Sequence, residues 1–218
     1  MICTSSFLNK LQLHIDFNTT NEAYKASLSI PYRNIRIAKC SQILRCNSRS
    51  VLMSILHNSK DFIKSLTIQD TIFPDYDQIF QGTRPICCIQ FYSNIFEIVA
   101  QNLTHLSLID CKEIINQKVD FPNLKHLELS QVEVDLVNVN APELIKLTID
   151  KNAIGCAILC PFLIKCRKLE SLSLKNSRYF YLGENCLILK NLKTFNFEKR
   201  KSLKNSELEA LQKFLFDQ

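Results

Sequence analysis

An apolar pattern that recurs along the chain constrains its fold more than any other feature. The form LxxLxLxx, followed by a small or polar residue, occurs in copies that begin at Leu103, Leu124, Leu144 and Leu169. Weaker copies begin at Leu8, Tyr32, Ile63, Ile86 and Leu192. A repeat period of about 20–29 residues is typical of chains in which each copy adds one short strand to a parallel sheet. We therefore expect an α/β fold with about nine parallel strands.

The residue between the last two apolar positions of each copy gives an independent test, because it was not used to find the copies. It is polar in every copy: Gln12, Arg36, Thr67, Gln90, Ser107, Glu128, Thr148, Ser173 and Asn196. Since 46% of the chain is hydrophobic, chance would produce this column in roughly 0.4% of cases. Alternate side chains of a strand point to opposite faces, so these polar residues should share the face opposite the core.

The segments between the strands complete the expected domain, which covers residues 1–218. Residues 48–59 carry apolar residues at helical spacing, and Val51, Leu52, Ile55 and Leu56 should face the core. We expect less regular repeats over 1–62, regular repeats over 63–204 and a capping helix over 205–218 that covers the last apolar layer. Pro161 should end the apolar segment that precedes it.

The ninth position of each copy usually carries Asn or Cys, whose side chain can bond the backbone of the turn that follows the strand. Cys40 and Cys111 fit this role, whereas Val132 and Arg200 depart from it and predict irregular turns. The ten cysteines lack the close CxxC pairs of a zinc site. We expect all of them to be reduced thiols.

These features resemble the leucine-rich-repeat superfamily over nearly the whole chain. The resemblance implies a solenoid, or horseshoe, with the parallel sheet on its concave face. The stretch LQLHIDFNTTNEAYKASLSIPYRNIRI is similar to the passage that follows the F-box in F-box/leucine-rich-repeat proteins. That similarity implies the substrate-recognition arm of a ubiquitin ligase, which would bind a ligase adaptor if an F-box lay upstream. A structural or regulatory repeat scaffold is the alternative.

Composition disfavours several other classes of protein. The chain has three glycines and neither GxGxxG nor GxxxxGK[ST], so it lacks the usual phosphate-binding loops, and no cofactor is expected. The net charge of +6 is a modest excess that does not require nucleic acid. The longest nearly apolar run, Ala153 to Ile164, falls short of the ~20 residues that span a bilayer. With no apolar leader at its start, the chain is expected in the cytoplasm or nucleus and not in a membrane.

Three chemical alternatives involve cysteine. Cys88, His105 and His126 fall in one column of consecutive predicted strands, which suits a zinc site, but the next residue in that column, Lys146, would repel a cation. Cys88 and His105 could form a nucleophile and base, yet the column offers no acidic partner to orient the histidine. Cys156 and Cys160 lie one helical turn apart and are expected to pack inward. We expect neither catalysis nor a bound metal.

The sequence therefore predicts a protein that binds another protein through the polar face of its sheet. The expected contact residues are Gln90, Tyr92, His105, Ser107, His126, Glu128, Lys146, Thr148 and Asp150. A basic strip near the C-terminus, with Lys190, Lys193 and Lys199 among its residues, is the competing binding surface.

Overall fold

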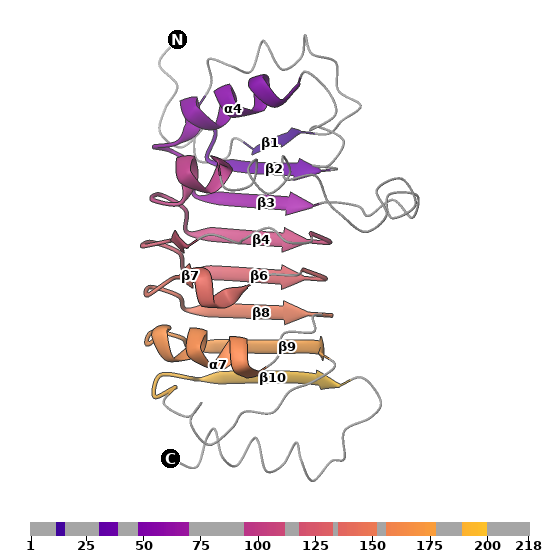
Figure 1. The fold of residues 1–218 in the computed structure, drawn as a ribbon, viewed down its shortest axis with the longest axis vertical. Coiled ribbons are helices and arrows are strands. Elements are labelled where there is room, and N and C mark those ends of the chain that lie inside the picture. Colours follow the sequence, from indigo (N-terminus) through magenta and orange to yellow (C-terminus); the bar gives the residue numbers. More distant parts are fainter. Residues whose placement is uncertain are drawn as a thin grey trace.

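The computed structural model describes residues 12–15, 31–38, 48–69, 94–111, 118–132, 135–151, 156–177 and 189–199. Within these ranges eight strands form one parallel sheet, which runs the length of the described part of the molecule (Figure 1). In sheet order they are β1 (Gln12–Ile15), β2 (Asn34–Ala38), β3 (Ser65–Gln69), β4 (His105–Ile109), β6 (His126–Ser130), β8 (Lys146–Asp150), β9 (Ser171–Ser177) and β10 (Thr194–Lys199). The strands follow one another in sequence order, so the chain builds the sheet one strand at a time.

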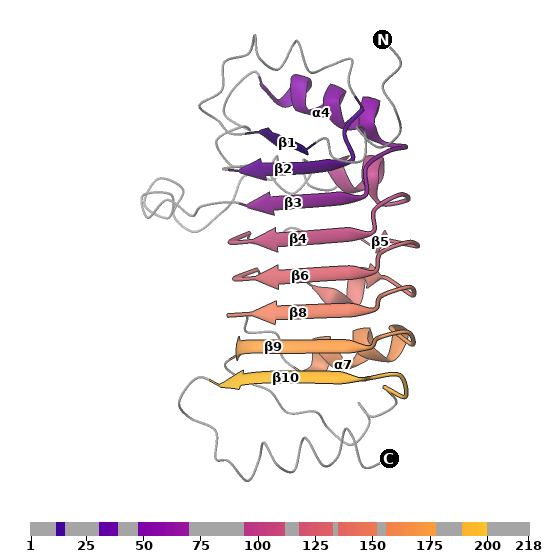
Figure 2. The same cartoon turned by 180° about the vertical axis from the view of Figure 1, so that it is seen from behind.

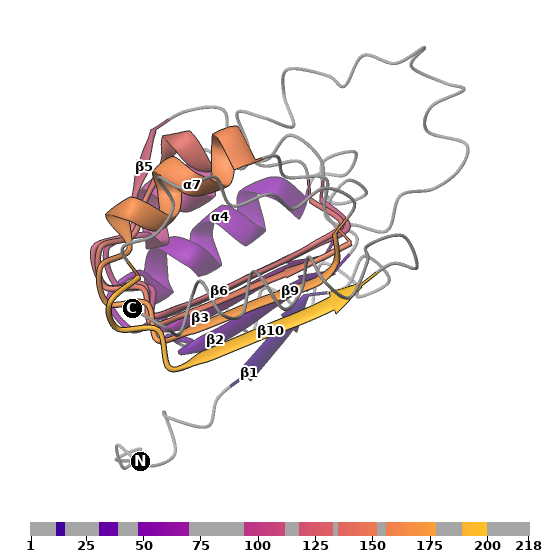
Figure 3. The same cartoon turned by 90° about the horizontal axis from the view of Figure 1, so that it is seen from below.

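A second layer covers one face of this sheet. It contains α4 (Ser48–Ser59), a helical segment over 94–99, β5 (Val119–Asp120), the 3₁₀ turn η1 (Leu136–Asn138), β7 (Val139–Asn140) and α7 (Cys156–Lys165). β5 and β7 pair in parallel as a small second sheet. Figure 3 shows α4 and α7 on the same side of the main sheet. We call the opposite side the open face; among the described residues no helix covers it (Figure 2).

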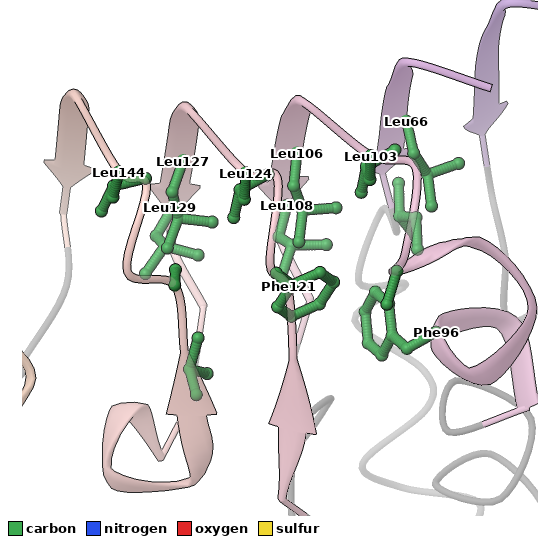
Figure 4. Packing of buried hydrophobic residues seen from close by; sticks show 14 of the residues in the cluster. Leu66, Phe96, Leu103, Leu106, Leu108, Phe121, Leu124, Leu127, Leu129 and Leu144 are labelled. Carbon is green, nitrogen blue, oxygen red and sulfur yellow. The ribbon is translucent and has the colours of Figure 1, made fainter. Parts of the chain in front are cut away.

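The core lies between these two layers and is built from repeated leucines. Leu106, Leu127, Leu147 and Leu172 have exposed fractions of 2%, 4%, 0% and 0%, as the repeat predicts. Figure 4 shows leucines from successive strands in line, with those of the preceding turns beside them. The predicted helix is confirmed as α4, and its residues Leu52, Ile55 and Leu56 are buried as expected, while the side chain of Val51 lies outside the described ones.

Backbone hydrogen bonds repeat from strand to strand. At the start of β4 the amides of Thr104 and His105 both donate to the carbonyl of Lys64, each over 2.9 Å. At the start of β6 the amides of Lys125 and His126 donate in the same way to the carbonyl of Thr104. The starts of β3, β8, β9 and β10 have the same forked arrangement. Each coil of the chain therefore lies on the previous one through equivalent backbone bonds.

The turns that leave the central strands also share one conformation. Asp110, Gln131, Lys151 and Asn176 have φ values of 55°, 53°, 52° and 53°, and each is the sixth residue counted from its strand's first residue. The irregular turn predicted at Val132 is therefore wrong: Gln131 matches its counterparts, and the Val132 side chain is buried in the core. Apolar packing replaces the side-chain bond that the pattern led us to expect there. At Cys111 that bond is present, with the thiol 3.1 Å from the carbonyl of Ile109.

One predicted strand does not occupy its expected place in the sheet. The copy that begins at Ile86 was placed between the strands that begin at Ser65 and His105, but β3 pairs directly with β4 over five residues. The main sheet thus has eight strands within the described residues, and residues 86–93 lie outside them. The spacing of the copies already argued against this strand, since Ile86 lies 17 residues before Leu103 and the repeat period is about 20–29 residues.

The helix α7 does not end where the sequence led us to expect. It continues through Pro161 to Lys165, although proline was expected to end it. Buried Leu159, Phe162 and Leu163 hold the helix against the core, and this packing outweighs the one backbone hydrogen bond that proline cannot make.

Cys160 on the same helix is disulfide-bonded, so the prediction that all ten cysteines are reduced is wrong. That prediction came from the expected compartment, which carries no information on which sulfur atoms the fold brings together. Cys111 and Cys166 are reduced and buried.

The remaining expectations concern the membrane and the C-terminus. In the ranges described above, no helix has both the length and the apolar character needed to cross a bilayer. The predicted capping helix over 205–218 and the turn at Arg200 lie outside the described residues.

Candidate functional site

Polar side chains line up across the open face because the strands pair in register. The first residues of β3, β4, β6 and β8 form one row, and the third residues form a second row. The first row is Ser65, His105, His126 and Lys146, and the second is Thr67, Ser107, Glu128 and Thr148. The intervening leucines point into the core, so the two rows share the open face as the alternation predicts.

These two rows surround an open depression of about 310 Å³. Its lining consists of both rows together with Leu106 and Leu127. Short side chains at Ser65, Thr67 and Thr148 leave the space, while longer histidine, glutamate and lysine side chains border it. A hollow of this size can take one or two side chains of a partner.

The two histidines of the first row are in contact. Their ring centroids are 4.2 Å apart and the rings are tilted by 49°. The hydroxyl of Thr104 lies 2.8 Å from Nδ1 of His105 and holds that ring in place. Partial burial, followed by the charge of Lys125, lowers the pKa of His105. The pKa of His126 is also lowered, first by burial and then by His105, Lys146 and Lys125.

The lowered histidine pKa values predict a loss of stability in mild acid. In the unfolded chain both imidazoles titrate near their ordinary pKa of 6.5, whereas the folded protein binds protons only at lower pH. The unfolded state therefore takes up more protons as the pH falls below about 6.5, and folding loses free energy across that range. Urea unfolding between about pH 7.5 and pH 5.5 measures the loss.

A His105→Gln/His126→Gln double variant should lose less stability than the wild type over the same interval. The matched control is His57→Gln, which removes a histidine from α4 and should keep the wild-type decline. Equal declines in the double variant and the wild type would contradict the role assigned to the histidine pair.

Other polar groups of the open face are already bonded to one another. Ser107 donates to Glu128 over 3.0 Å across β4 and β6. Asp150 accepts from Ser130 over 3.3 Å and from Asn176 over 3.0 Å. Asp150, one of the predicted contact residues, thus links β6, β8 and β9 near the carboxyl ends of these strands and does not line the depression.

Six of the nine predicted contact residues line the depression: His105, Ser107, His126, Glu128, Lys146 and Thr148. Gln90 and Tyr92 lie outside the described residues, as does Cys88. The place expected for Cys88 beside His105 belongs to Ser65, and that expected for Gln90 beside Ser107 belongs to Thr67. Ser65 and Thr67 were missed because an extra strand was inserted before β4. The short 17-residue spacing could have revealed them.

The described residues bear on the metal and thiol alternatives in two places. Over the ranges that the structure describes, no group of three or more His, Cys, Asp or Glu side chains is placed to hold a metal ion. Burial raises the pKa of the Cys166 thiol to about 12, although Lys165 opposes the shift. That thiol therefore stays protonated and packs as a small apolar group.

Comparison with known proteins gives no family and no function for this chain. No protein-family model matches the chain, and no curated protein and no solved structure matches it either.

Proposed function

We propose that this chain is a leucine-rich-repeat solenoid that binds another protein through its open face and performs no reaction itself. The observation that carries the proposal is the pair of polar rows around the depression, on a sheet face that no helix covers among the described residues. Neighbouring strands lie roughly 4.8 Å apart, so the seven gaps between the eight strands make a face roughly 34 Å long. That length is enough for a protein interface of standard size.

Two structural regularities support the repeat part of the proposal. The forked backbone bonds recur at the start of each main-sheet strand from β3 to β10, and left-handed turns recur after β4, β6 and β8. Equivalent bonds at equivalent positions are what stacked repeats produce. The resemblance to leucine-rich-repeat proteins remains part of the proposed function. The solenoid would have eight repeats in the described residues instead of about nine, one for each strand of the main sheet.

The role as a substrate-recognition arm of a ubiquitin ligase is a narrower form of the same proposal. It rests on the resemblance of the segment that contains β1 and β2 to the passage after an F-box. These strands pair in parallel and are the first two strands of the main sheet. A scaffold that acts without a ligase adaptor would use the same face.

A partner identified by affinity purification allows the face to be tested. We expect the His105→Ala/His126→Ala/Lys146→Ala variant to bind that partner at least about tenfold more weakly, because central interface residues carry most of the binding energy. The matched control is Lys190→Ala/Lys193→Ala, at the turn before β10, which should bind as the wild type does. Circular dichroism would check that both variants are folded. If the face variant bound undiminished while the control lost the partner, the binding surface would be the basic strip.

A further inference from the structure

Positive and titratable groups gather at one end of the depression. His105, His126 and Lys146 occupy neighbouring places in the first row, and the histidine rings are in contact. Lys125 precedes β6, and its charge lowers the pKa of both histidines. Three basic groups from three strands therefore line this end of the depression, and the charge of a fourth, Lys125, reaches both histidines.

The one acidic side chain in the lining lies at the other row. Glu128 is two residues along β6 from His126, a separation of about 6.6 Å along the strand. Its carboxylate accepts a hydrogen bond from Ser107, which holds it over the β4 side of the second row. The first row therefore keeps its positive character, and Glu128 limits where an anion could lie.

We propose that the first row is a recognition site for an acidic side chain, the carboxylate of an Asp or Glu in an extended segment of a protein partner, placed between His126 and Lys146. The inference rests on the proposed function, which it extends to the chemistry of the partner. Lys146 supplies a permanent positive charge, and the imidazoles can donate hydrogen bonds to carboxylate oxygens. The hydroxyls of Ser65 and Thr148 can bond the backbone of the segment.

Binding of this kind takes up protons. The pKa values of both histidines lie below the ordinary 6.5, because burial and the charge of Lys125 oppose protonation of each ring, and His105 and Lys146 oppose it at His126. A bound carboxylate would offset that repulsion and favour the imidazolium form. Affinity should therefore rise as the pH falls from about 7.5 to about 6, by up to about tenfold per pH unit for each proton taken up.

The test uses the full chain and two capped peptides, one of alternating Glu and Ser residues and one of alternating Gln and Ser. Histidine ring signals are followed by nuclear magnetic resonance during titration. We expect the Glu peptide to shift the signals of His105 and His126 but not that of His57, and to raise the pKa of both shifted residues. The Gln peptide should bind at least about fivefold more weakly, and Lys146→Glu should abolish the preference for the Glu peptide. The charge-matched control, Lys60→Glu beyond the end of α4, should keep it.

The outcomes separate this inference from the proposed function. If both peptides shifted His105 and His126 equally, the face would bind peptides without reading their charge, so the inference would fail and the proposed function would stand. If neither peptide shifted these signals, the acidic-segment inference would fail, and the purified partner and face variant described above would still decide the proposed function. A preference that survived Lys146→Glu would also overturn the inference.

Discussion

Phe121→Ala is expected to lower the free energy of unfolding by about 3–5 kcal/mol, the range found for aromatic residues removed from a core. Phe121 is fully buried behind the main sheet, and its ring meets that of Phe96 edge to face, with centroids 5.6 Å apart (Figure 4). Phe96 belongs to the helical segment over 94–99, so the contact ties two successive return segments together. Denaturant unfolding of the purified variant measures the loss.

The matched control for this substitution is Phe62→Ala. The Phe62 side chain is 51% exposed, so its removal should cost about 1 kcal/mol or less. A double variant that lacks both Phe96 and Phe121 should be more stable than the two single losses predict, by about 0.5–1.5 kcal/mol, because the ring contact is lost only once. Similar losses from Phe62→Ala and Phe121→Ala would mean that the second layer does not pack as described.

Leu127→Ala should cost about 2–5 kcal/mol. Leu127 lies on β6 and is paired with Leu106 and Leu147 on the neighbouring strands. Its side chain is buried, so its removal would leave a cavity in the core. Because β6 pairs with β4 on one side and β8 on the other, a cavity at Leu127 weakens the packing on both sides. Urea unfolding should show a lower midpoint.

Ile164→Ala provides the comparison for this residue. Ile164 is 55% exposed on α7, and alanine is a better helix former, so the change should leave the free energy of unfolding within about 1 kcal/mol of the wild type. If Ile164→Ala lowered the free energy of unfolding as much as Leu127→Ala, Ile164 would belong to the core, which would contradict the packing described for α7.

Core and candidate site share the same strands. Leu106 and Leu127 line the floor of the depression while their side chains pack in the core. Substitution of these leucines would therefore alter binding indirectly, by moving β4 and β6. Side chains of the open face, such as His126 and Lys146, avoid this effect, because their loss leaves the core packing intact.

The candidate site could be predicted only in part. Alternation along each strand was enough to place His105, Ser107, His126 and Glu128 on one face, because that property depends on neighbouring residues of the same strand. It could not supply Ser65 and Thr67, since their position beside β4 depends on which distant strand pairs with it. Nor could it show that Asp150 is bonded to Ser130 and Asn176, because those bonds depend on the geometry of the turns.

The sequence was enough to predict where the eight described strands lie, that they run parallel, and which side chains of the central strands β3, β4, β6, β8 and β9 are buried. A regular spacing of leucines carries that information locally, since a strand with one apolar face must bury it and each return segment brings the chain back in the same direction. Three features became known only from the folded structure: β3 pairs with β4, the rings of His105 and His126 are in contact, and Cys160 is bonded to another sulfur. These are contacts between segments far apart in the chain, and the alternation within a strand is the same whichever segment lies beside it.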